Sequence, residues 1–112
     1  MANPTLFDHA NHAARQTDPL TSQHAAGPAR DTQRRWVLLE LAARGNAGAT
    51  DQELGDAVGI LRTSAGKRRL ELLRDGLVAK TGLTRPTDTG ASAIVWRITE
   101  RGLLAAAKVL GD

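Results

Sequence analysis

Cysteine is absent from this sequence, which excludes disulfide bonds, thiolate zinc sites and cysteine nucleophiles. Tyrosine is absent as well, and there are only three aromatic residues: Phe7, Trp36 and Trp96. A protein that stacks the bases of a single nucleic-acid strand needs several exposed aromatic side chains, so that class of binding is disfavoured. Both tryptophans stand among apolar residues, and we expect them to pack in the core or at its edge.

Long apolar runs are also missing. No stretch approaches the roughly 18 apolar residues of a membrane span. The first residues lack the basic and apolar regions of a secretory signal. We therefore expect a soluble, cytoplasmic protein with no membrane partner. Its 112 residues, 41% of them hydrophobic, allow one domain with a small core.

Residues suited to catalysis or metal binding are few. His9 and His12 stand three positions apart and His24 follows later, but no carboxylate or thiol completes a convincing metal site. Asp18, Ser22 and His24 are the residue types of a hydrolase triad, yet nothing nearby suggests an oxyanion hole. A phosphate-cradling glycine motif is absent too. We expect no enzymatic activity, no cofactor and no bound metal.

The first 30 residues differ in composition from the rest of the chain. Pro4, Pro19 and Pro28 interrupt a segment rich in alanine, asparagine, threonine and histidine, and few of its residues could join a core. Residues 1–30 are therefore predicted to form a flexible arm, with one short helical turn over residues 21–26. The folded domain is predicted to span residues 31–112.

Within this domain, apolar residues recur at helical spacing in four segments, and β-branched and aromatic residues gather in two others. Thr50 and Glu53 have the spacing of a capping box, and Thr99 can cap the last helix. The expected helices span residues 31–44, 51–58, 62–75 and 100–110. A short extended segment is expected at 48–50, strands at 77–81 and 93–98, and a turn-rich loop at 82–90.

Two strings in these elements resemble known domains. TDQELGDAVGILRTSAGKRRLELLRDGLV, at residues 50–78, resembles the paired helices of winged helix-turn-helix domains. IVWRITERG, at residues 94–102, is similar to the wing strand and following helix of MarR-type regulators. The resemblance implies a mainly α fold with a small antiparallel β wing (α+β), in which residues 82–92 form the wing.

A third string, DPLTSQHAA at residues 18–26, resembles the segment that precedes such domains in small actinobacteriophage proteins. The combined resemblance implies sequence-specific binding of double-stranded DNA by a small phage or prophage transcriptional regulator. In that family the helix at residues 62–75 enters the major groove. The residues implied at DNA are Arg62, Thr63, Ser64, Gly66, Lys67, Arg68 and Arg69 from this helix, Arg85 from the wing, and Arg34 and Arg35 from the start of the first helix.

Helical periodicity assigns faces to this helix. It places on the buried side Leu61, Ala65, Arg69 and Leu72. Arg68 and Arg69 flank that side, so their stems are expected on apolar surface and their charged heads at phosphates. Leu70 turns toward the DNA side, where a polar residue is more usual. Thr63 and Ser64 either contact DNA or only cap the helix.

The distribution of charge supports the same face independently. The formal net charge is only +3. Residues 59–86 nevertheless contain seven basic and two acidic residues, whereas residues 51–58 contain three acidic residues and no basic one. Such segregation favours a positive face that neutralises phosphates. Ordinary surface charge on a solvated helix is the alternative.

Two questions about partners stay open at this point. The last helix has an apolar stripe that either forms a homodimer or packs on the first helix of its own chain: Leu103, Leu104, Ala107 and Leu110. Winged helices also bind proteins, since a fold does not determine a function. The alternative to DNA binding is therefore an interaction module that binds or inhibits a host protein, with Leu70 exposed for that purpose.

Overall fold

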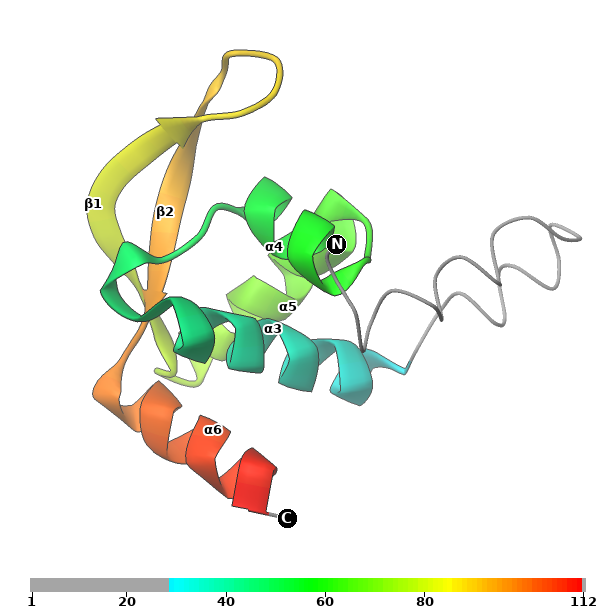
Figure 1. The fold of residues 1–112 in the computed structure, drawn as a ribbon, viewed down its shortest axis with the longest axis vertical. Helices are drawn as coiled ribbons and strands as arrows, with labels where there is room; N and C mark the ends of the chain where they lie inside the picture. The colour runs from blue at the N-terminus through cyan, green and yellow to red at the C-terminus, as the bar shows by residue number, and fades with distance from the viewer. Residues whose placement is uncertain (1–28, 112) are drawn as a thin grey trace, which may run out of the picture.

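The structure, a computed structural model, describes residues 29–111 (Figure 1). In chain order its elements are helix α3 (Arg30–Arg44), a 3-10 turn η1 (Gly45–Ala47), helices α4 (Asp51–Val58) and α5 (Arg62–Arg74), strands β1 (Val78–Pro86) and β2 (Ser92–Ile98), and helix α6 (Glu100–Gly111). The two strands form an antiparallel hairpin beside the helices, and α6 lies at the opposite end from the hairpin's turn. This is the expected α+β winged helix-turn-helix fold.

The core lies where α3, α4 and α5 meet the base of the hairpin. Its fully buried side chains come from each of these elements: Leu41, Leu54, Leu72, Val37, Val58 and Val78. Trp96 is buried and Trp36 packs against the core from its edge, as expected for both. Each of these helices therefore buries its apolar face in the same hydrophobic core, as its apolar spacing predicted.

The helix boundaries follow their capping residues. The Thr50 hydroxyl accepts from the Glu53 amide at 3.2 Å, and the Glu53 carboxylate accepts from the Thr50 amide at 3.0 Å. This capping box begins α4 where the sequence predicted. At the last helix, the Thr99 hydroxyl accepts from the Gly102 amide at 3.0 Å.

The extended segment before α4 attaches the hairpin to the helices. Ala49 and Trp96 exchange two backbone hydrogen bonds, of 2.8 and 2.9 Å, so residue 49 acts as a one-residue third strand. Gly48 makes this approach feasible, because a Cβ at this position would lie 2.3 Å from the Trp96 carbonyl oxygen. The hairpin is therefore attached to the helical part of the domain through residue 49.

The prediction for the wing was wrong in one respect: β1 does not end at residue 81 but continues to Pro86. The pairing register shifts between Lys80 and Thr84. The Thr81 hydroxyl bridges this irregularity, since it accepts from the Leu83 amide and donates to the Val95 carbonyl, both at 3.0 Å. The wing turn is consequently short and spans only residues 87–91.

The periodicity argument also misplaced Leu61. It was expected on the buried side of α5, but it precedes the helix as its N-cap residue and is 73% exposed. An extended N-cap residue does not follow the helical wheel, because its backbone dihedrals differ from those of the helix. Leu70, expected to be exposed, is half-buried.

Several predictions concern residues outside the described part of the chain. They are the flexible arm, its helical turn at residues 21–26, and the histidines of the rejected metal and hydrolase sites. Within residues 29–111, no group of histidine and acidic side chains could hold a metal ion. In the same range, no helix is long and apolar enough to cross a membrane.

Candidate nucleic-acid interface

The N-terminal half of α5 presents an open polar surface. Arg62, Thr63 and Lys67 are exposed and Ser64 is half-buried. No side chain caps this helix, so Thr63 and Ser64 are not capping residues. Lys67 makes no ion pair or hydrogen bond with another described residue. The first turns of α5 therefore leave a cation and two hydroxyls available to a ligand.

The wing turn lies next to this surface. One guanidinium nitrogen of Arg62 donates to the Asp88 carboxylate at 3.3 Å, and the Asp88 amide donates to the Gln52 side-chain oxygen at 3.1 Å. These two contacts hold the turn of the hairpin against the first turns of α4 and α5. Sequence reasoning missed both Gln52 and Asp88, because they lie 36 positions apart in the chain.

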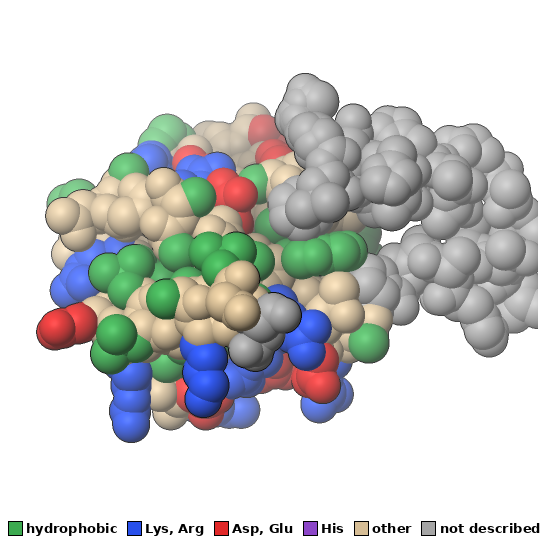
Figure 2. All heavy atoms as spheres, turned by 60° about the horizontal axis from the view of Figure 1, so that its bottom comes forward, with side chains coloured by type: hydrophobic (Ala, Val, Ile, Leu, Met, Phe, Trp, Pro, Cys, Tyr) green, Lys and Arg blue, Asp and Glu red, His purple; other side chains and the backbone are tan. Residues whose placement is uncertain are grey.

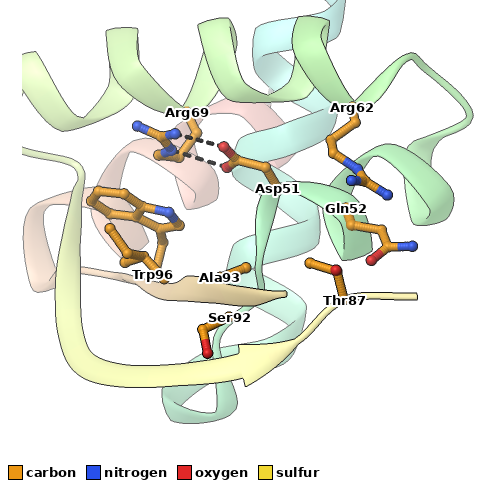
Figure 3. Close-up of a pocket in the computed structure, with 9 residues that line it drawn as sticks. Asp51, Gln52, Arg62, Arg69, Thr87, Ser92, Ala93 and Trp96 are labelled. Carbon is orange, nitrogen blue, oxygen red and sulfur yellow. Dashed lines mark hydrogen bonds and ion pairs between the residues drawn. The ribbon is translucent and has the colours of Figure 1, made fainter. Parts of the chain in front are cut away.

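Arg69 lies behind that surface and joins three elements (Figure 3). Its guanidinium makes two hydrogen bonds to the Asp51 carboxylate, at 3.0 and 2.6 Å, and lies 4.1 Å from the centroid of the Trp96 ring. A paired, fork-shaped contact of this kind fixes orientation as well as distance, and the indole face adds a cation–π attraction. Arg69 therefore positions α5 relative to α4 and β2.

The structure explains why a glycine is found at position 66, in the middle of α5, which the sequence alone did not. A Cβ at this position would lie 3.0 Å from a carboxylate oxygen of Asp51, within the pair that Asp51 forms with Arg69. The glycine accommodates this pair against the helix. A side chain at this position would require the Asp51–Arg69 pair to shift by a few tenths of an ångström.

Arg68 is turned into the domain. It is 8% exposed, donates to the Gln33 side-chain oxygen at 3.2 Å, and pairs with Glu71 at 3.1 Å. Its Nε atom is buried without a hydrogen-bond partner. The structure thus brings neither Arg68 nor Arg69 to the exposed face on which both were expected to reach phosphates.

Of the three remaining arginines expected at DNA, Arg34 and Arg85 pair with other residues in the described part of the chain and Arg35 does not. Arg85 does not extend toward the wing turn but bonds back to the Ala47 carbonyl at 2.9 Å and pairs with Glu53 at 3.3 Å. Arg34 pairs with Asp75 at the end of α5. Arg35 is exposed and has no ion pair or hydrogen bond among residues 29–111.

A pocket of about 340 Å³ separates the wing from the helices. Figure 3 shows Asp51, Arg69 and Trp96 at one side and Arg62, Gln52 and Thr87 at the other. Its walls come from α4, α5 and the hairpin, so the start of α5 and the wing turn border the same hollow.

Comparisons with known proteins agree on the fold. Two structures of the same double mutant of Lactococcus lactis ZitR, one of them in its apo form, are similar to this chain. The apo form matches with a TM-score of 0.56 at 15% identity over 73% of this chain and 57% of that chain. The other matches with a TM-score of 0.55 at 15% identity over 71% and 50%.

This chain therefore spans little more than half of the ZitR chain that it matches. No protein-family model matches the sequence, and neither does any curated protein sequence. At this level of identity the similarity establishes a shared winged helix-turn-helix fold.

Proposed function

We propose that this protein binds double-stranded DNA in a sequence-specific manner and regulates transcription. The observation that carries the proposal is the open polar surface on the first turns of α5, with Lys67 unpaired among the described residues and the wing attached beside it. In helix-turn-helix proteins, the N-terminal residues of the second helix contact base edges. Thr63, Ser64 and Lys67 take that role here, and Arg62 and Arg35 contact phosphates.

Arg68, Arg69 and Gly66 have a different role in this proposal. Arg68 and Arg69 hold α5 against α3 and α4 from inside the domain, through Gln33 and Asp51, and Gly66 leaves room for the Asp51–Arg69 pair. Arg85 likewise holds the wing strand to α4, through Glu53. Their effect on DNA binding is indirect, because each orders the elements that carry the contacting side chains.

Substituting Lys67 by alanine is expected to weaken DNA binding. A good base contact contributes about 1–3 kcal/mol of discrimination, which corresponds to a loss of roughly 5- to 150-fold in affinity. The measurement is fluorescence anisotropy with a mixed-sequence duplex and with DNA from upstream of the protein's own locus, each at two salt concentrations. Tighter binding to the upstream DNA, weakened at the higher salt, would support a sequence-reading regulator.

Arg74→Ala is the matched control for this variant. Arg74 is an exposed cation on the same helix, but it lies about 18 Å along the axis from Arg62, given a rise of 1.5 Å per residue. Its removal is expected to change affinity by less than about twofold, since distant surface charges are largely screened. Equal losses for Lys67→Ala and Arg74→Ala would contradict the assignment of the DNA-contacting end.

We also propose a homodimer through the outer face of α6. This helix packs on α3 and the core through Ala106, Ala105 and Val109. The apolar stripe named in the sequence analysis is therefore not the face that packs on the first helix of the same chain. The stripe remains outside: Leu103, Leu104 and Leu110 are 49%, 69% and 73% exposed, and Ala107 is exposed as well. Figure 2 looks onto this side, where apolar side chains form a band bordered by basic ones.

Replacing Leu104 by glutamate is expected to convert such a dimer into a monomer, because a charge would be buried in an apolar interface. Sedimentation velocity over a range of protein concentrations measures this. A dimer would place two α5 helices at half-sites about one DNA turn, roughly 34 Å, apart. A wild-type protein that stays monomeric at all concentrations would rule the interface out.

A protein-interaction module is the second candidate function. Leu70 does not favour it, since it is half-buried. Leu61 does, because this large apolar side chain is 73% exposed beside Arg62 at the start of α5. Absence of DNA binding even at low salt would favour this candidate, with a host protein as partner if the chain is encoded by a phage or prophage.

A further inference from the structure

The wing turn carries a carboxylate, Asp88, that pairs with Arg62 at the end of α5 that is proposed to enter the DNA groove. Arg62, the first residue of that helix, donates to Asp88 at 3.3 Å, and the two side chains are 49% and 61% exposed. Asp88 is the only acidic residue of β1, the wing turn and β2. An acidic side chain is therefore held where a DNA-binding surface would otherwise present an uncompensated arginine.

A guanidinium recognises carboxylates and phosphates through the same planar set of donors. Asp88 and a phosphate of the DNA backbone are consequently alternative partners for Arg62. We propose that Asp88 is an intramolecular competitor of the DNA phosphate: it occupies Arg62 in the free protein and releases it when DNA binds. The inference rests on the proposed DNA-binding function and adds a mechanism that limits affinity at the same site.

The geometry allows this exchange without rearranging the wing. The turn is also held by the bond from the Asp88 amide to Gln52, which involves only the backbone of residue 88. An ion pair between two such exposed groups is weak in water, so a phosphate can displace it.

The test is the substitution Asp88→Asn in the full chain, which keeps the size of the side chain and the backbone amide but removes the charge. Anisotropy titrations use a mixed-sequence duplex at about 50 and about 200 mM salt. We expect affinity to rise by about three- to tenfold at the lower salt. The slope of log K against log salt should steepen by about 0.9, the value for one charge, because residue 88 no longer takes up a cation when Arg62 leaves it for a phosphate.

Two further variants isolate the role of Arg62. Glu100→Gln removes one negative charge from the start of α6, at the end of the hairpin opposite the wing turn, and is expected to change affinity by less than about twofold. In an Arg62→Ala background, Asp88→Asn should give no gain. A gain that persists without Arg62 would reflect general repulsion and would overturn the proposed competition.

The remaining outcomes separate this inference from the proposed function. Wild-type binding with no gain, or with weaker binding, in Asp88→Asn would overturn the inference alone. Weaker binding would identify Asp88 as a residue that positions the wing. Absence of binding by both wild type and Asp88→Asn at low salt would overturn the DNA-binding function and the competition together.

Discussion

Substituting Gly48 by alanine is expected to lower the free energy of unfolding by about 4 kcal/mol. The backbone there has φ +65° and ψ −167°, a region that is essentially restricted to glycine and costs other residues about 1–3 kcal/mol. The new Cβ would also lie 2.3 Å from the Trp96 carbonyl oxygen and 2.9 Å from a Val95 methyl carbon. Overpacking of this kind costs a further 1–3 kcal/mol or so.

Gly45→Ala is the control for the backbone contribution. Gly45 also has a positive φ, of +58°, but a Cβ there would meet nothing within 4 Å. Urea denaturation followed by tryptophan fluorescence compares the two variants. Gly48→Ala should be the less stable by about 1–3 kcal/mol, the contribution of the close approach. Equal destabilisation would mean that the hairpin can shift away from residue 48 at no cost.

Substituting Leu72 by alanine is expected to cost about 2–5 kcal/mol, because it empties a fully buried position at the centre of the domain. Native domains are typically stable by only about 5–15 kcal/mol, so this variant should lose a large share of the stability of the domain. The midpoint of urea denaturation should fall without a change in slope.

Leu61→Ala removes the same atoms from the start of the same helix. Since Leu61 is 73% exposed, its loss is expected to change stability by less than about 0.5 kcal/mol. Comparing the free energies of unfolding of the two variants thus tests which of the two leucines, both expected on the buried side, is buried. Similar destabilisation by both would contradict the placement of Leu61 at the N-cap.

The candidate site was only partly predictable from the sequence. The exposed residues of the first turns of α5, Thr63 and Lys67, follow from helical periodicity alone. The partners of the arginines do not, because charge composition records how many cations are present but not which acids face them. Arg69 and Asp51 lie 18 positions apart, and Arg68 and Gln33 lie 35 apart. Only the packing of α5 on its neighbours pairs them.

By itself, the sequence determined the fold class and most element boundaries. These depend on local signals: apolar spacing, the capping box at Thr50 and the cap at Thr99. Tertiary structure alone decided the extent of β1, the attachment of the wing through Gly48, and which arginines stay exposed. The physical reason is that these features depend on contacts between residues distant in the chain, whose free energies no local pattern of residues encodes.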